Sequence, residues 1–263
     1  MLYDNINYIA DISYLTNVFI YEYDISKANI NILFTKGIID EKTYNYLYES
    51  PRMVRQVYVG KLCKDENISI ALKAGIIEAK KLLFSANNIQ DHEILSIKND
   101  AVFIIGRELQ YTSFGLIKFV CKNKYTAFYK INNMELYYYY NNINKEEYID
   151  VKGISDDNLK YHSNYFLQFL KDIFYSIQVN GPEISLRMMK DFFMQYISLQ
   201  LPVDYYRSFD AQSMYVFKRI GNSIYNSSIA LESQKMMLDT NTNIRVLMEI
   251  QKIIMSIYFN KYR

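Results

Sequence analysis

The sequence predicts an α+β protein in which an antiparallel sheet backed by helices is followed by an all-α region. Two runs of strand-forming residues each lead to an aspartate, Asp24 in the first and Asp100 in the second. Between them, residues 41–87 carry apolar side chains at helical spacing. Because the strand pattern stops near residue 153 and helical spacing continues to the end, we expect two domains, residues 1–153 and 154–263.

The strand runs define the expected sheet. The first run ends in Asp24, and a helical pattern begins directly after it. In the second, two short apolar segments flank the polar turn Lys98-Asn99-Asp100, which is typical of a β-hairpin. We therefore expect three adjacent antiparallel strands, with helices from 25–87 packed on the back of their sheet; the strands are residues 17–24, 93–97 and 101–106.

The remaining elements follow from apolar spacing and from turn residues. The helices expected before the hairpin are residues 41–48, 52–62 and 68–84. After the hairpin we expect strands at 115–120, 125–131, 135–140 and 148–151. The all-α region is predicted to contain helices at 158–177, 183–199, around 213–224, and 243–262.

Composition excludes several classes of protein. No apolar run reaches the roughly 18 residues of a membrane helix, the start does not resemble a signal peptide, and two cysteines are too few for a disulfide framework. We therefore expect a cytoplasmic protein with no membrane partner. The abundance of Asn, Ile, Lys and Tyr is typical of AT-rich coding, as in low-GC bacteria and their phages, so the host cytoplasm is the expected location for a phage product.

Charge and motifs narrow the candidate chemistry. The net charge of +2 means that any nucleic-acid surface must arise from local clustering of cations. His92 and His162 have no Cys or His at metal-ligand spacing, and we interpret them as structural or exposed. No glycine-rich phosphate loop and no Ser/His/Asp or Cys/His set is present. Two carboxylates at the ends of separate strands, in contrast, suit a pair of magnesium ions on a nucleotide's phosphates.

The order of these segments resembles the palm and thumb of family B DNA polymerases. Residues 23–30, YDISKANI, keep the aspartate of motif A, D-x-x-S-L-Y-P, and KNDA at 98–101 keeps the second aspartate of motif C, D-T-D-S. On the spacing of motif B, K-x-x-x-N-S-x-Y-G, the matching positions are Arg52, Gln56, Val59, Gly60 and Lys61.

Two later segments extend the resemblance over roughly residues 17–178. Residues 119–125, FVCKNKY, lie where the family carries a Lys-x-Tyr segment that touches the primer end, and VKGI at 151–154 resembles the signature that leads into the thumb. The fingers, at about residues 36–90, are short, and only 16 residues precede the motif A strand.

The resemblance implies a role for each matched residue. Asp24 and Asp100 would be the catalytic ligands of Mg²⁺ or Mn²⁺. The incoming triphosphate would meet Arg52, Gln56 and Lys61, with Asn29 near its sugar. The primer-template would meet Arg55, Lys122, Lys124 and Tyr125.

Two departures from the family pattern have chemical consequences. Asn29 stands where the family has a tyrosine that packs under the sugar and rejects ribose, which puts selection for deoxyribose in doubt. Lys98 replaces a carboxylate, so its cation is expected either to pair with Asp24 or Asp100 and lower metal affinity, or to contact a phosphate.

Each of these residues also has an ordinary structural interpretation. Asp100 would serve as a turn residue, Asp24 as a helix N-cap, and the cations of residues 52–64 as the solvated side of a helix. Three functions therefore stand side by side. The first is a minimal DNA polymerase without an exonuclease domain, acting on primer-template and nucleoside triphosphates. The second is an inactive polymerase-derived binding or structural subunit, working with other phage replication or transcription proteins. The third is an unrelated phage interaction protein.

Overall fold

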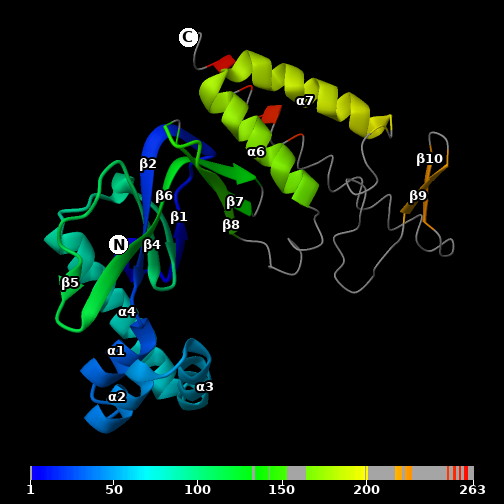
Figure 1. Ribbon diagram of the computed structural model, residues 1–263. Coiled ribbons are helices and arrows are strands. Elements are labelled where there is room, and N and C mark those ends of the chain that lie inside the picture. Colours follow the sequence, from blue (N-terminus) through cyan, green and yellow to red (C-terminus); the bar gives the residue numbers. More distant parts are fainter. Residues whose placement is uncertain are drawn as a thin grey trace. The chain divides into compact units, whose positions relative to one another are not determined.

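The chain folds as an α+β protein (Figure 1). The computed structural model describes residues 2–131, 134–141, 143–152, 164–198, 200, 217–220 and 223–226, together with 248, 251–252, 255 and 258–259. Within these residues there are six α-helices and an antiparallel sheet of eight strands, ordered β1-β3-β4-β2-β6-β7-β8 with β5 paired to β6. The predicted α+β class is confirmed.

The residues form two compact units. Unit 1 contains residues 1–12 and 18–124, and unit 2 contains residues 13–17 and 125–263. The division falls inside two long strands, β2 (Tyr14–Ile25) and β6 (Ile117–Ile131), which contribute residues to both units. The sequence pattern instead suggests a division at 153, because alternation of apolar and polar residues continues to that point.

The strands of unit 1 carry both aspartates. The hairpin β3 (Ile94–Lys98) and β4 (Ala101–Ile105) pairs through β4 with β2, and β1 (Asn7–Ile9) pairs with the outer side of β3. A short strand, β5 (Ser113–Phe114), pairs with the start of β6. The predicted adjacency of the three strands that carry Asp24 and Asp100 is therefore confirmed.

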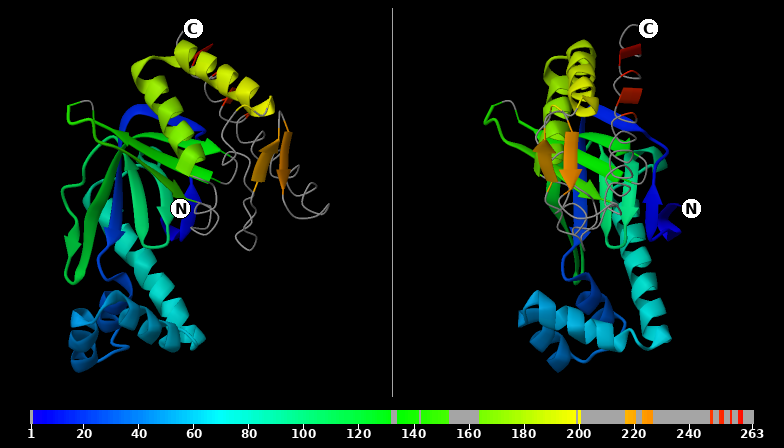
Figure 2. Two further views of the ribbon diagram at one scale, coloured as in Figure 1. Left: turned by 45° about the vertical axis from the view of Figure 1, so that its right-hand side comes forward. Right: turned by 90° about the vertical axis from the view of Figure 1, so that its right-hand side faces the viewer.

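The helices of unit 1 follow their predicted bounds closely. They are α1 (Ala28–Thr35), α2 (Glu41–Glu49), α3 (Arg52–Leu62) and α4 (Glu66–Ala86), with single 3-10 turns at Leu2–Asp4 and Asp91–Glu93. Side chains cap two of them, since Asp40 accepts a hydrogen bond from the amide of Thr43, at 2.8 Å, and Asp65 from that of Asn67, at 2.9 Å. Figure 2 shows α4, in cyan, extending from the group formed by α1–α3 to the strands.

The core of unit 1 lies between α1, α4 and one face of the strands. Tyr23 and Ile25 of β2 and Val102 of β4 belong to one buried cluster with Leu33 of α1 and Leu83 of α4. Gly75 allows α4 to approach α1, because a Cβ at this position would lie 2.3 Å from a methyl carbon of Ile32. The prediction that the helices of residues 25–87 pack on the back of these strands is confirmed for α4. Figures 1 and 2 show α1–α3 grouped beyond the end of the strands, and the buried cluster joins them to the core through α1 and α4.

Unit 2 combines strands with two amphipathic helices. β7 (Met134–Tyr140) pairs with β6 and with β8 (Glu147–Lys152), and α6 (Asn164–Val179) precedes α7 (Pro182–Ile197). Aromatic rings pack this unit: Tyr129 stacks on Phe174 with centroids 4.0 Å apart, and Phe169 on Phe192 at 3.5 Å.

Two expectations about secondary structure are wrong. The strands expected at 115–120 and 125–131 are one strand, β6, which begins at Ile117. The polar residues between the two expected strands are held against β2, since Lys122 pairs with Asp24 and the side-chain amide of Asn123 donates to Glu22. Where a helix was expected around 213–224, the described residues instead form two paired antiparallel strands, β9 (Phe217–Ile220) and β10 (Ser223–Asn226). Gly-Asn at 221–222, between aromatic and β-branched residues, is the hairpin signal that the helical assignment missed.

Other predicted segments are only partly covered. Residues 158–163, 199, 213–216 and 221–222, the turn at 132–133 and the second half of the VKGI segment lie outside the described residues. Of the last predicted helix, the described residues 248, 251–252, 255 and 258–259 are helical. No helix within the described part of the chain is long and apolar enough to cross a membrane.

Candidate active site in unit 1

The turn between β2 and α1 positions the first aspartate. Asp24 is the penultimate residue of β2, and Lys27 at the start of α1 has left-handed backbone angles, φ 50° and ψ 39°. The buried side chain of Asn31 holds this turn by donating to the carbonyl of Ser26, at 2.8 Å, while the amide of Ser26 donates to the carbonyl of Lys118, at 2.8 Å. The turn is thus fixed from both the helix and the neighbouring strand.

Strand register brings the second aspartate beside the first. Asp24 lies directly opposite Ala101, and the amide of Ile25 donates to the carbonyl of Asp100 at 3.3 Å. Opposed residues in antiparallel strands have Cα atoms about 4.5 to 5.5 Å apart, and consecutive Cα atoms are about 3.8 Å apart. The Cα atoms of Asp24 and Asp100 are therefore within about 9 Å of each other, close enough for their side chains to reach a shared pair of metal ions.

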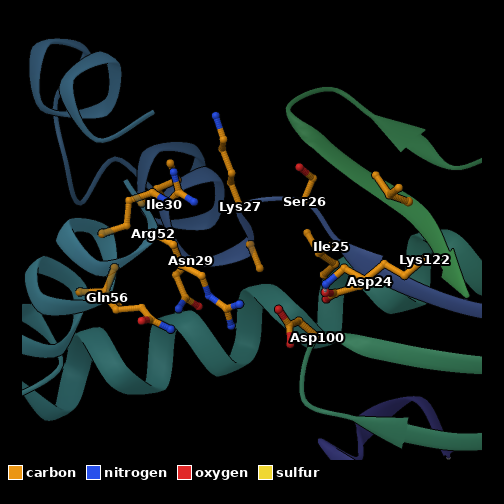
Figure 3. A pocket seen from close by; sticks show the side chains of 14 residues that line it. Asp24, Ile25, Ser26, Lys27, Asn29, Ile30, Arg52, Gln56, Asp100 and Lys122 are labelled. Carbon is orange, nitrogen blue, oxygen red and sulfur yellow. Dashed lines mark hydrogen bonds and ion pairs between the residues drawn. The ribbon is translucent and has the colours of Figure 1, made fainter. Parts of the chain in front are cut away.

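Both aspartates line one cavity of about 470 Å³. Its wall consists of the β2–α1 turn (residues 24–30), one face of α3 (Arg52, Arg55, Gln56 and Val59), Asp100, and Val120 and Lys122 of β6. Figure 3 shows Asp24, Asp100 and Lys122 together on one side, facing Arg52, Gln56 and Asn29 on the other. An acidic wall and a basic, amide-bearing wall thus face each other across the cavity.

A lysine forms an ion pair with one carboxylate oxygen of Asp24. The Lys122 ammonium forms an ion pair with Oδ2, while Oδ1 is buried and has no hydrogen-bond partner among the described residues. The cation paired with Asp24 therefore comes from β6. The sequence had suggested Lys98 from the hairpin, as a partner of Asp24 or Asp100 or as a phosphate contact. A buried carboxylate oxygen without a partner is costly in a protein, so Oδ1 is well suited to receive a ligand.

The environment of Asp100 favours its neutral form. Partial burial raises the pKa of this carboxyl above its usual value, and a backbone hydrogen bond and the cations Arg52 and Lys80 oppose that rise in part. Lys80 is fully buried on α4 and donates to the carbonyl of Asn5, at 2.7 Å; burial lowers its pKa to about 8. Two carboxylates and three nearby cations thus form one electrostatic cluster.

The opposite wall is suited to an anion. No side chain caps α1, and the amides of its first turn, at Ala28, Asn29 and Ile30, belong to residues that line the cavity. Arg52 contributes a guanidinium, and Arg55 lies beside it while donating to the carbonyl of Ser50 at 2.6 Å. Helix amides and guanidinium groups together favour phosphate.

The structure does not gather every predicted residue. Lys61 is nine positions beyond Arg52, about half a turn around the helix at 100° per residue, and it does not line the cavity. Tyr125 is fully buried in unit 2, where its hydroxyl donates to Asp150 at 3.0 Å, so it offers no surface to a primer. Lys124 lies outside the cavity, its ammonium 3.8 Å from the ring centroid of Phe19.

Four features of the site were not predicted from the sequence. Lys80 resembles an ordinary exposed helix lysine. It nevertheless falls on the apolar face of α4, next to Ala79, and this position could have predicted its burial. Asn31 and the uncapped start of α1 had no comparable signal. The pairing of Lys122 with Asp24 joins residues 98 positions apart, and no local pattern predicts it.

The acidic wall fits a magnesium ion that arrives with phosphates. The described residues include no group of three or more His, Cys, Asp or Glu side chains that could hold a metal by themselves. Magnesium, however, commonly binds through one or two carboxylates, with substrate phosphates and water completing its shell. Asp24, with its unpartnered Oδ1, and Asp100 would supply those carboxylates.

No curated protein matches this sequence. A family model described as "Bacteriophage PBS1 gene 130 protein" matches residues 1–256. This description confirms the predicted phage origin and indicates no DNA polymerase family. Since the match extends over nearly the whole sequence, the chain belongs to the Bacteriophage PBS1 gene 130 protein family.

Proposed function

We propose that this protein is a minimal nucleotidyltransferase of polymerase type, which adds nucleotides to a DNA primer on a template. The observation that carries the proposal is a single cavity that holds Asp24 and Asp100 on one wall and Arg52 with the start of α1 on the other. Two carboxylates facing a phosphate-binding wall are what metal-assisted phosphoryl transfer requires. The order of strand, helices and hairpin supports a palm-like assignment for unit 1.

Each wall has a separate task in this proposal. The amides of the first turn of α1 and the guanidinium of Arg52 would bind the triphosphate, and Gln56 and Asn29 would lie beside the rest of the nucleotide. Asp24 and Asp100 would hold Mg²⁺, or Mn²⁺ in its place. A bound metal pair supplies a lowered pKa for the primer hydroxyl and neutralises charge on the transferred phosphoryl group.

Nucleic-acid binding would depend on local cations, because the whole chain is nearly neutral. Arg55, Lys122 and Lys124 would bind backbone phosphates in unit 1. Such contacts are independent of base sequence and weaken as salt rises. Reversing the charge at Lys124, for instance with Lys124→Glu, should therefore weaken primer-template binding for all sequences alike, as measured by fluorescence anisotropy.

A second function has specific support. Lys122 already neutralises Asp24, and Lys98 stands where the resembled motif has a carboxylate. A polymerase-derived subunit that binds nucleic acid within a phage complex, without turnover, would tolerate both features. This alternative predicts salt-dependent binding of primer-template and no incorporation.

Primer extension separates the two functions. With Mg²⁺ or Mn²⁺, Asp24→Asn and Asp100→Asn should each lower incorporation by roughly a thousandfold or more, because each removes a metal ligand. Asp11→Asn serves as the control, since Asp11 is exposed and outside the cavity. If wild-type protein binds primer-template and incorporates nothing with either metal, the binding subunit is the correct function. If neither binding nor incorporation occurs, both proposals are wrong.

A further inference from the structure

The ion pair between Lys122 and Asp24 involves a carboxylate that is proposed to bind the metal ion. Lys122 Nζ contacts Oδ2 of Asp24, and the side chain of Asp24 is only 15% exposed. An ammonium and a divalent cation repel each other at short distance, so Lys122 on Oδ2 weakens metal binding at this carboxylate even when the metal takes the unpartnered Oδ1. Metal binding is therefore stronger when Lys122 moves away.

The surrounding charge strengthens this competition. Arg52 and Lys80 act on Asp100 while Lys122 pairs with Asp24, so three cations already outnumber the two carboxylates. A divalent ion entering alone would add two further positive charges to a site that is already net positive. An anion that enters with the metal removes that obstacle, because its charge offsets both the metal and the displaced lysine.

Lys122 is built to move. Its side chain is 54% exposed, and a lysine ammonium on a flexible four-carbon stem changes partner readily. A phosphate bound at the start of α1 would lie across the same cavity that Lys122 lines. The lysine could then exchange a carboxylate oxygen for a phosphate oxygen without leaving the cavity wall.

We propose that Lys122 is an internal counter-ion that makes metal binding depend on a polyphosphate. Without an anion, Lys122 occupies Asp24 and keeps the divalent ion out. When a metal–polyphosphate complex enters, Lys122 moves to the phosphates and frees Asp24 for the metal. This inference rests on the proposed nucleotide site, and it assigns to that site an order of events: metal and triphosphate bind together.

Titration calorimetry with manganese tests the proposal without requiring catalysis. Wild-type protein should bind the preformed 1:1 complex of Mn²⁺ and inorganic tripolyphosphate at least tenfold more tightly than Mn²⁺ alone. Lys122→Met should bind Mn²⁺ alone at least tenfold more tightly than wild type, because the competing cation is gone. Adding Asp24→Asn to Lys122→Met should abolish that gain.

The control is Lys118→Met, an exposed lysine of the same strand that does not line the cavity. Lys118→Met should bind Mn²⁺ as tightly as wild type does. Melting curves check that all variants are folded, and Lys122→Gln is used instead if Lys122→Met does not fold. Equal Mn²⁺ affinity in wild type and Lys122→Met, or an equal gain in Lys118→Met, overturns the inference. If the gain depends on Asp24 but wild type incorporates no nucleotide, the inference holds and the polymerase function fails.

Discussion

Lys80 provides the sharpest quantitative test of the electrostatics beneath the site. Its side chain is fully buried, and its pKa is lowered from 10.5 to about 8 by that burial. At roughly 1.4 kcal/mol per pKa unit, this difference means that the charged lysine destabilises the folded state by roughly 3 to 4 kcal/mol at neutral pH. The hydrogen bond from Lys80 to the carbonyl of Asn5 offsets about 1.5 kcal/mol of this destabilisation. Lys80→Met should therefore raise the free energy of unfolding by about 2 kcal/mol at pH 7.

The pH dependence has a definite sign. Because the pKa of Lys80 is lower in the folded state than in the unfolded state, the unfolded chain binds more protons between pH 8 and 10.5. Wild-type stability therefore rises with pH across that window relative to the variant. The advantage of Lys80→Met should be complete below pH 8 and should shrink as pH approaches 10.5.

Urea denaturation of wild type and Lys80→Met at pH 7, 8, 9 and 9.5 measures this difference. Taking the difference cancels the titration of the many tyrosines, which both proteins share. Lys73→Met, an exposed lysine of the same helix, should show almost no effect at any pH. The reasoning is refuted if Lys80→Met is less stable than wild type at pH 7, or if the difference between them does not change with pH.

Four further substitutions test the stability of the fold. Burial raises the pKa of Asp100, so its ionised form destabilises the folded state at neutral pH, and this penalty disappears as pH falls through the raised pKa. Without metal, Asp100→Asn should therefore have a higher melting temperature than wild type at pH 7, and the difference should shrink on acidification. A lower melting temperature of the variant at pH 7 would contradict this. Gly60→Ala should raise the free energy of unfolding by about 0.5 to 1 kcal/mol, because an added Cβ meets only open space in a helix. Gly75→Ala should lower the free energy of unfolding by about 1 to 2 kcal/mol, because the added Cβ would collide with Ile32. Urea denaturation of both glycine variants measures this difference, and equal effects would be evidence against the close packing of α1 and α4. Asn87→Ala should lower the free energy of unfolding by about 2 to 3 kcal/mol, because the buried Asn87 amide donates to the carbonyls of residues 83 and 111 and accepts from the backbone amides of 110 and 111. In the same denaturation series, a decrease below about 0.5 kcal/mol would show that water replaces these bonds.

The local elements of unit 1 could be predicted because each has its own pattern. The bounds of α3 follow from Pro51 at its start and from apolar spacing, and those of the β3–β4 hairpin from a polar turn between apolar runs. The two errors have the same origin. The predictions at 121–124 and around 213–224 were based on residue type alone. In both places the described residues form strands because a neighbouring strand pairs with them.

Individual site residues divide in the same way. Asp24, Asp100, Arg52 and Gln56 line one cavity as the motif order suggested, because a strand end, a hairpin tip and a helix face are local properties. Lys61 failed because it lies on the opposite face of α3, which the helical period alone would have revealed. The role of Tyr125 was unpredictable, since its burial depends on the packing of unit 2.

The sequence by itself therefore determined the α+β class, most element bounds in unit 1, and the two aspartates at the ends of separate strands. These properties depend on side-chain periodicity and turn chemistry over a few residues. Only the tertiary structure decided that Lys122 holds Asp24, that Oδ1 of that carboxylate has no partner in the described chain, and that Lys80 is buried near Asp100. Such charges belong to residues far apart in the chain, and strand register and helix packing, which no local pattern encodes, determine which of them meet.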